Sequence, residues 1–166
     1  DLKPGVVSLE GKLVSLTRRP DGPVRVSGVI ADATGAIRFT IRDGEEVPEI
    51  AAGQWFRVSL AVADMYRGAM NLQIHSGTIC EPITEDRSLR PAVIPVSQVS
   101  PGIVCLRVKI IREYESASER VFQSGIAGDE TGTIRFVTWK DESAQRLEPG
   151  MVYTLYYISA DEFNGR

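Results

Sequence analysis

Short segments of alternating apolar and polar residues dominate the first 80 residues. In 36–42 the side chains of Ile37, Phe39 and Ile41 fall on one face of an extended chain, and polar side chains fall on the other. Four other runs have the length and apolar content of strands: 6–17, 24–31, 53–62 and 70–74. Proline, aspartate and glycine separate the runs and favour turns. The pattern therefore predicts five strands.

Two details of this pattern bear on the topology. Residues 45–52 predict a short helix between the third and fourth strands. In the fourth strand, four apolar side chains are expected to point the same way: Phe56, Val58, Leu60 and Val62. Five strands with a long first strand and a helix after the third are typical of an OB barrel. An SH3-like barrel is the competing topology, but it does not usually place a helix there.

The chain contains an internal repeat. Shifted by 97 positions, residues 1–69 align with 98–166 without a gap, and about 19 of the 69 aligned pairs are identical. The strongest block places Asp32–Phe39 over Asp129–Phe136. We interpret the two halves as a duplicated domain, because the period is far longer than the repeat unit of a solenoid.

The second copy repeats the order of strands and reaches Arg166 immediately before the position of the fifth strand. A barrel without its last strand would expose an unpaired edge, which folded proteins usually avoid. We therefore expect the natural protein to continue past Arg166, or another segment to fill the gap. The predicted fold class is all-β, with two tandem five-stranded OB-fold barrels of which the second is truncated before its last strand.

Residues 81–100 carry three prolines and few large apolar side chains, which is typical of a semi-rigid linker. The predicted domains are therefore an OB domain at 1–80, this linker at 81–100, and a second OB domain at 101–166 that is incomplete at its C-terminus. The alternative for 81–100 is an ordered strap over one of the domains.

Composition argues against several classes of protein. Hydrophobic residues make up 43% of the 166 residues and charged residues 25%, and no apolar run approaches the roughly 20 residues of a membrane helix. One histidine and two cysteines provide little material for a metal site or a Ser-His-Asp site. We expect no metal, no cofactor, no membrane partner and no enzymatic activity. Because the net charge is −3, a nucleic-acid site would need locally placed cations.

OB barrels bind ligands on the open face of their second and third strands and on the adjoining loops. In the second copy, Ile134 and Phe136 are expected to face the core. Arg135 and Trp139 then lie on the open face, where the indole could stack on a base with a gain of about 1–3 kcal/mol. The alternative is that Trp139 packs under the segment 141–148.

A turn near the end of each copy carries an aromatic residue, Tyr66 in the first and Phe163 in the second. The same residue type at the same turn indicates a shared role in ligand binding, and packing against the first strand is the alternative. Trp55 and Phe122 are weaker candidates. Trp55 is predicted opposite the Phe56 face of its strand, where a surface patch or a domain interface would explain it equally well.

Arginines would supply the contacts to phosphates. Arg38 and Arg135 occupy equivalent outward positions, and Arg42 stands where the second copy has Trp139. A guanidinium can pair with a phosphate and can also lie flat on a base. Further candidates adjoin the loops: Arg18, Arg19, Arg25 and Arg67. The alternative is that these side chains are solvated and paired with nearby acids.

The run 129–139, Asp-Glu-Thr-Gly-Thr-Ile-Arg-Phe-Val-Thr-Trp, followed after a strand by Asp161–Arg166, resembles an OB domain of replication protein A. The archaeal single-stranded DNA-binding members, with serial OB domains, are the most similar in style. The resemblance implies an intracellular, cytoplasmic protein that binds single-stranded DNA in replication, repair and recombination. It also implies base stacking on Trp139 and Phe163, and on Tyr66 in the first copy. The first copy departs from the pattern at Arg42.

Two functions from different classes follow from these observations. The first is sequence-tolerant binding of single-stranded DNA through base stacking and phosphate contacts. The second is a protein-interaction scaffold within a replication or repair complex, in which Trp139 would anchor a peptide or a further OB domain. RNA binding by the same face stays open, because nothing in the sequence reads a 2′-hydroxyl.

Overall fold

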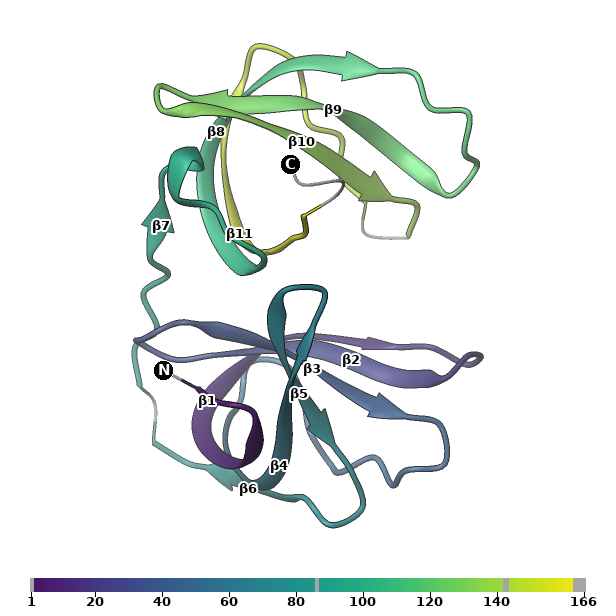
Figure 1. Ribbon diagram of the computed structural model, residues 1–166, viewed down its shortest axis with the longest axis vertical. Helices are drawn as coiled ribbons and strands as arrows, with labels where there is room; N and C mark the ends of the chain where they lie inside the picture. Colours follow the sequence, from purple (N-terminus) through teal and green to yellow (C-terminus); the bar gives the residue numbers. More distant parts are fainter. Residues whose placement is uncertain (1, 86, 142–143, 163–166) are drawn as a thin grey trace. The chain divides into compact units, whose positions relative to one another are not determined.

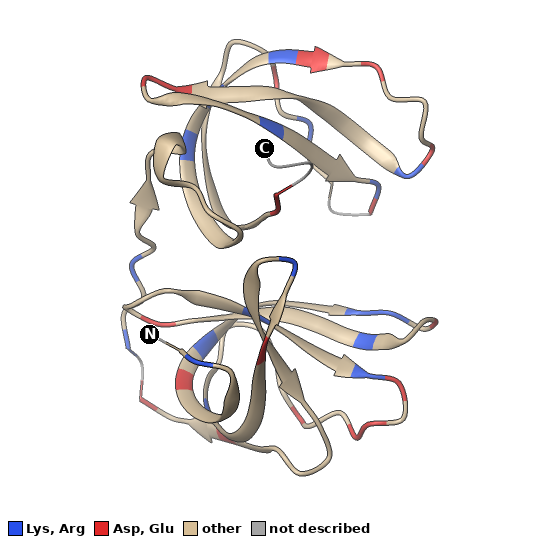
Figure 2. Cartoon of the chain, viewed as in Figure 1, with Lys and Arg blue, Asp and Glu red and all other residues tan. Residues whose placement is uncertain are grey.

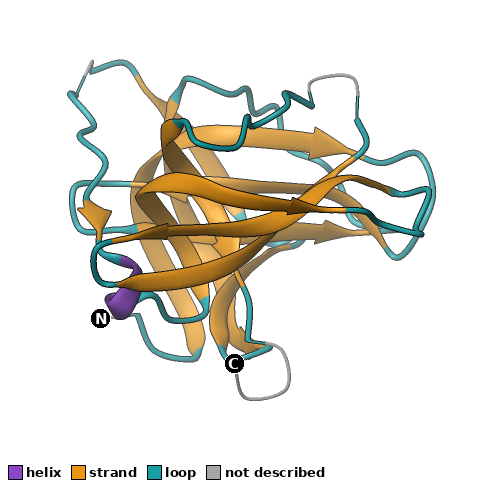
Figure 3. Ribbon diagram, turned by 90° about the horizontal axis from the view of Figure 1, so that it is seen from above, coloured by secondary structure: helices purple, strands orange, loops and turns teal. Residues whose placement is uncertain are grey.

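The structure is a computed structural model that describes residues 2–85, 87–141 and 144–162, and it consists almost wholly of β-strands (Figures 1 and 3). The chain divides into two compact units. Unit 1 comprises the described residues within 1–92, 100–103 and 159–166, and unit 2 those within 93–99 and 104–158. Each unit has a hydrophobic core of its own.

Unit 1 is a closed five-stranded barrel with one additional strand. Its strands are β1 (Gly5–Arg18), β2 (Val24–Ala31), β3 (Ala36–Arg42), β4 (Trp55–Tyr66), β5 (Ala69–Ile74) and β6 (Ile79–Ile83). The order is β1-β2-β3-β5-β4, and pairing of β1 with β4 closes the barrel. β3 and β5 run parallel, whereas the other neighbours are antiparallel. This is the OB order, which confirms the predicted all-β fold and excludes the SH3-like alternative.

The barrel interior contains the apolar face predicted for β3. Phe39 and Ile41 are fully buried together with Leu72 of β5. Gly28 of β2 lies directly beside this core. A Cβ atom there would meet the carbonyl oxygen of Ser15 and would lie 2.6 Å from the Phe39 ring. A glycine is therefore required for β1, β2 and the Phe39 ring to approach this closely.

Unit 2 repeats the arrangement of β1, β2, β3 and β4. Its elements are β7 (Val93–Ile94), the 3-10 helix η1 (Val96–Gln98), β8 (Gly102–Tyr114), β9 (Val121–Asp129), β10 (Gly132–Trp139) and β11 (Val152–Ala160), of which the first two residues of β8 and the last two of β11 are grouped with unit 1. The sheet order is β10-β9-β8-β11, with β7 parallel to β8. This second sheet is consistent with a second OB domain. Within the described part of the chain, no strand pairs with β10 as β5 pairs with β3.

Local features of unit 1 recur in unit 2 at the same offset of 97 residues. The pairing of β1 with β2 shifts register between Leu13 and Ser15, and that of β8 with β9 shifts between Ile110 and Arg112. Leu60 and Tyr157 both have a positive φ, 60° and 54°, which is unusual for residues with a side chain. The repeat therefore reproduces backbone irregularities as well as residues.

The turns after β2 and β9 are also built alike. Oδ1 of Asp32 accepts hydrogen bonds from the backbone N–H and the hydroxyl of Thr34, and Asp129 does the same with Thr131. In unit 2, Oδ2 of Asp129 also accepts the N–H of Val96, which ties η1 to the turn. The Thr131 hydroxyl and then the Val96 N–H lower the pKa of the Asp129 carboxyl. The Asp-x-Thr-Gly block thus has a structural role.

Two predictions for unit 1 are wrong. Residues 45–52 form an irregular loop and not a helix: Pro48 interrupts the stretch, and Ile50 folds into the core. Leu60 is 50% exposed and does not share the buried face of Phe56 and Val58. Its positive φ marks an irregularity in β4, after which Ala61 is buried in its place.

The division into domains at 1–80, 81–100 and 101–166 stays a prediction, but the ends of the 81–100 range carry regular structure. β6 continues to Ile83 on the edge of β4, and β7 and η1 lie at 93–98. The apolar side chains of Ile94 and Val96 pack in the core of unit 2, which explains why this part is ordered. Between β6 and β7, none of the described residues belongs to a helix or strand.

The segment that follows β6 contacts the barrel of unit 1 through Arg87. Its guanidinium lies 5.8 Å from the ring centre of Trp55 and donates to Glu10 at 2.7 Å. Arg57 donates to the same carboxylate, and the hydrogen bonds from Arg87 and then Arg57 lower the pKa of Glu10. Trp55 is buried, and its Nε1 has no hydrogen-bond partner among the described residues. Trp55 is therefore part of this attachment rather than of an exposed patch.

The close approach at Gly28 makes a prediction about stability. Gly28→Ala should destabilise unit 1 by about 1–3 kcal/mol, because the new methyl group overlaps the Ser15 carbonyl and the Phe39 ring. Gly35→Ala is the matched control, since a Cβ atom there meets nothing within 4 Å. Chemical denaturation measures both variants. Equal stability of Gly28→Ala and Gly35→Ala would show that this approach does not constrain the barrel.

A second prediction concerns the attachment of the segment after β6. In a Trp139→Phe background, Trp55 is the only tryptophan left. Arg87→Ala should shift its fluorescence emission to the red, because the guanidinium that covers the ring is removed. Arg90→Ala, which removes an exposed arginine of the same segment, should leave the emission unchanged. Identical spectra for the two variants would contradict the proposed attachment.

Candidate nucleic-acid interface

The outward face of unit 2 is set by strict alternation along β10. Ile134 and Phe136 are half-buried and pack against the core, whereas Arg135, Val137 and Trp139 are exposed. The Trp139 side chain is 61% exposed. β10 therefore presents a cation, an apolar side chain and an indole along one side, as the sequence predicts.

Neighbouring strands extend this face across the sheet. Arg135 pairs with Ile126 of β9, and Ile126 pairs with Arg112 of β8. The next row contains Val137, Ser124 and Tyr114. Residues paired in this way point to the same side of a sheet. We call these seven residues the β8–β10 face: Arg112, Tyr114, Ser124, Ile126, Arg135, Val137 and Trp139.

Sequence reasoning missed Arg112 and Tyr114. Counted in steps of two from the buried Ile110, both residues would point into the core. The register shift between Ile110 and Arg112 reverses the alternation and leaves Ile111 52% exposed. Arg112 and Tyr114 therefore point outward. The available signal was an arginine at a position where simple alternation predicts an apolar residue.

Arg112 and Tyr114 also contact each other. The Arg112 guanidinium lies 5.5 Å from the centre of the Tyr114 ring, within the range of a cation–π interaction. Arg112 is exposed and Tyr114 is half-buried. Neither Arg112 nor Arg135 forms an ion pair with an acidic residue in the parts of unit 2 that are described. Both guanidinium groups are therefore available to a ligand.

One end of the unit 2 core is covered by residues other than Trp139. Gln123 of β9 is 2% exposed. Its side-chain amide donates a hydrogen bond to the Leu147 carbonyl at 2.6 Å and accepts one from the Leu147 N–H at 2.9 Å. Leu147 packs against the core. Residues 142 and 143 lie outside the described structure. The exposure of Trp139 and the position of Leu147 argue against the alternative in which the indole packs under 141–148.

The equivalent face of unit 1 has different chemistry. At the positions of Arg112, Tyr114 and Trp139 it carries Ser15, Thr17 and Arg42. Arg42 is exposed, whereas Arg38 is half-buried and is thus less accessible than its counterpart Arg135. Two polar residues of the same face are buried, Ser27 at 9% and Asn71 at 8% exposure. This face therefore offers cations but no aromatic platform.

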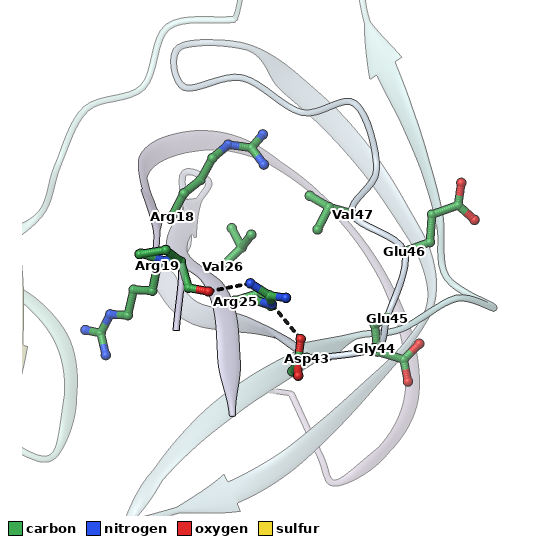
Figure 4. Close-up of a pocket in the computed structure, with 10 residues that line it drawn as sticks. Arg18, Arg19, Arg25, Val26, Asp43, Gly44, Glu45, Glu46 and Val47 are labelled. Atoms are coloured by element: carbon green, nitrogen blue, oxygen red, sulfur yellow. Dashed lines mark hydrogen bonds and ion pairs between the residues drawn. The ribbon is translucent and has the colours of Figure 1, made fainter. Parts of the chain in front are cut away.

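The arginines at the β1–β2 loop line an open pocket of unit 1 with a volume of about 820 Å³ (Figure 4). Arg25 is paired with Asp43 at 2.5 Å and also donates to the Pro20 carbonyl. Arg18 and Arg19 are exposed and form no ion pair within the described parts of the chain. The structure thus brings all three predicted arginines to one pocket but leaves only Arg18 and Arg19 without an acidic partner.

The turn between β4 and β5 presents Tyr66 and Arg67. Tyr66 is 56% exposed, and the Arg67 guanidinium lies 5.3 Å from its ring centre. Exposure of this ring argues against its packing on the first strand. Phe163, the predicted partner in the second copy, lies outside the described residues. Phe122 is half-buried where the pairing of β9 with β10 shifts register, which gives it no place on the β8–β10 face.

Charge is distributed over both units without a basic arm, as Figure 2 shows by the mixture of blue and red segments. Within the described residues, no group of three or more His, Cys, Asp or Glu side chains is placed to hold a metal ion. No helix in that part of the chain is long and apolar enough to cross a membrane. The arrangement is thus one of local cations and rings on an otherwise mixed surface.

Two solved structures with TM-scores above 0.5 support the fold, and a third has a weaker similarity. A murine DNA binding protein bound with double-stranded DNA is 12% identical with a TM-score of 0.56, and the similarity covers 96% of this chain and 91% of that chain. The HINa domain of Ifi202 in complex with a 20-bp double-stranded DNA is 10% identical with a TM-score of 0.53, over 98% and 92% of the two chains. The OB domain of MM0293 from Methanosarcina mazei is 22% identical over 52% of this chain and 82% of its own, with a TM-score of 0.49. No curated protein matches the sequence.

Comparison with family models supports the kind of barrel. Residues 6–82 match the model described as single-stranded DNA binding protein, Ssb-like, OB fold. The matched range extends from β1 into β6 and so covers the barrel of unit 1. Unit 2, which carries the exposed tryptophan, lies outside it. The first half of the chain is therefore similar to an Ssb-like OB fold, a binding fold of a kind that suggests nucleic-acid binding.

Proposed function

We propose that the protein binds single-stranded DNA without strong sequence preference, and that the β8–β10 face of unit 2 is its principal site. The observation that carries this proposal is the 61% exposure of Trp139 on the same strand face as Arg135. An indole in water leaves a large apolar area uncovered, and stacking on a base would cover it. The adjacent guanidinium can pair with a phosphate of the same strand.

An unpaired strand suits this face better than a duplex. A stacking platform needs the flat face of a base, and in a duplex that face is already covered by neighbouring base pairs. The two solved structures described above contain double-stranded DNA, whereas the family model matched by unit 1 is named for single-stranded DNA. Duplex and RNA are therefore separate arms of the test below.

Unit 1 would contribute a second, weaker site. Arg42 and Arg38 could pair with phosphates, and Arg18, Arg19 and Arg67 could do so from the loops, with Tyr66 available for stacking. Arg25 is a weaker candidate, because Asp43 already holds its guanidinium. Two linked sites would bind one strand more tightly than either site alone, since the second contact becomes intramolecular.

The wider role that we propose is in DNA replication, repair or recombination, within a protein similar to replication protein A or to archaeal single-stranded DNA-binding proteins. Such a role would place the chain inside the cell with the chromosomal DNA. The support is the Asp-Glu-Thr-Gly turn with Trp139 in unit 2, together with the Ssb-like match of unit 1. We infer binding and not catalysis, because the matched family is described by what it binds.

One observation favours a protein-interaction scaffold as a second candidate. β10 exposes two apolar side chains on the same face, Val137 at 47% and Trp139 at 61%. Exposed apolar side chains that lie together are typical of surfaces that bind another polypeptide. In that case the indole would anchor a polypeptide instead of a base, and DNA would bind weakly.

The test is a tryptophan-fluorescence titration with oligo-dT, duplex DNA and RNA at two salt concentrations. In a Trp55→Phe background, Trp139 alone reports binding, and oligo-dT should quench it. Trp139→Ala should weaken the affinity for oligo-dT about 5- to 150-fold, measured by anisotropy of a labelled strand, because one stacked base is worth about 1–3 kcal/mol.

The control variant is Tyr156→Ala, which removes an exposed ring from β11, outside the β8–β10 face. Its affinity for oligo-dT should equal that of the unsubstituted protein. Equal and weak binding of oligo-dT, duplex and RNA, unaffected by Trp139→Ala, would contradict the proposal and favour the scaffold.

A further inference from the structure

We infer that Tyr114 and Arg112 form a second stacking position for single-stranded DNA on unit 2, so that the strand crosses the sheet from β10 to β8. This inference rests on the proposed function and adds a binding position on a strand that sequence reasoning left out. The argument depends on the register of three strands, on the contact between the two side chains, and on a comparison with unit 1.

The register places the two aromatic residues on the outer strands of the β8–β10 face, on opposite sides of β9 and toward the same end. Tyr114 pairs with Ser124, and Ser124 pairs with Val137, two residues before Trp139 on β10. With strands about 4.8 Å apart and about 3.4 Å per residue, the Cα atoms of Tyr114 and Trp139 are about 12 Å apart. Stacked rings have centres about 4.5–7 Å apart, so the two positions would hold different bases.

The contact between Arg112 and Tyr114 gives this part of the face both a ring and a charge. The guanidinium lies 5.5 Å from the ring centre, which restricts the motion of both side chains before a ligand arrives. A base can stack on the planar guanidinium or on the ring, and the charge can also pair with a phosphate. Arg135 lies in the same cross-strand row as Arg112, with Ile126 between them. Cations therefore border the path between the two rings on one side.

Unit 1 provides an internal comparison. It has the same register shift after Leu13, which turns Ser15 and Thr17 outward at the positions of Arg112 and Tyr114. The backbone irregularity is thus common to both units, but only unit 2 places a cation and a ring there. The same difference is found at the end of the third strand of each unit, where unit 2 has Trp139 and unit 1 has Arg42. Both aromatic positions therefore belong to the same unit.

The experiment compares Tyr114→Leu, Tyr114→Phe and Tyr156→Leu in the full chain. The probe is labelled oligo-dT long enough to span both units, with affinity measured by anisotropy and Trp139 quenching measured in a Trp55→Phe background. Tyr114→Leu should weaken the affinity for oligo-dT about 5- to 150-fold, as loss of one stacked base predicts. At saturation, oligo-dT should still quench the fluorescence of Trp139 in this variant. Tyr114→Phe keeps the ring, so its affinity for oligo-dT should equal that of the unsubstituted protein. Tyr156→Leu should have no effect.

The outcomes separate this inference from the proposed function. Loss of affinity in Trp139→Ala but not in Tyr114→Leu would overturn the second position and leave the proposed function intact. Absence of oligo-dT binding by the unsubstituted protein would overturn both. Equal weakening in Tyr114→Leu and Tyr114→Phe, with unchanged thermal unfolding, would overturn the stacking role, because Phe retains the ring. Rescue by Phe alone would support it.

Discussion

The register shift in the first long strand of each unit determines which side chains reach the open face. Between Ile110 and Arg112 the inward and outward alternation of β8 reverses. Arg112 and Tyr114, which would otherwise point into the core, therefore turn outward, and Arg112 joins the cross-strand row of Arg135. Without that shift, Arg112 and Tyr114 would compete with Phe136 and Ile134 for the interior. The candidate site therefore depends on a backbone irregularity as much as on residue type. The same irregularity follows Leu13 in unit 1, where it exposes only small polar side chains.

Other constraints are also common to the two units and hold corresponding strands at the same close approach. Gly28 and Gly125 allow the same close approach: in unit 2, a Cβ atom at Gly125 would meet the Arg112 carbonyl and lie 2.8 Å from the Phe136 ring. Because Gly125 lies directly against the backbone of Arg112, this contact determines how closely β8 approaches β9 beside the site. The faces, in contrast, have diverged. A duplicated scaffold with different surface side chains is consistent with unequal roles for the two units.

Alternation alone correctly predicts the buried face of β3 and the outward face of β10, because both strands are regular. The outward positions of Arg135 and Trp139 could therefore be predicted from the sequence, whereas their part in ligand binding stays a prediction. Leu60 was placed on the wrong face and Arg112 was overlooked for the same reason. A residue with an unusual φ, or a shift of register, reverses the inward and outward alternation of the residues that follow it. The helix predicted at 45–52 failed because burial of Ile50 decides the path of a segment with weak local preference. Trp55 could not be placed, since Arg87, which covers it, lies 32 residues away in sequence and contacts it only in the folded chain.

Backbone NMR of the chain titrated with oligo-dT tests most directly whether the β8–β10 face holds an unpaired strand. We expect the largest changes of amide chemical shift at Arg112–Tyr114 and at Arg135–Trp139, with smaller changes at the loops that carry Arg18 and Tyr66. Residues Val152–Tyr156 of β11 should be unaffected, because they lie outside this face. Changes confined to unit 1 or centred on β11 would contradict the account.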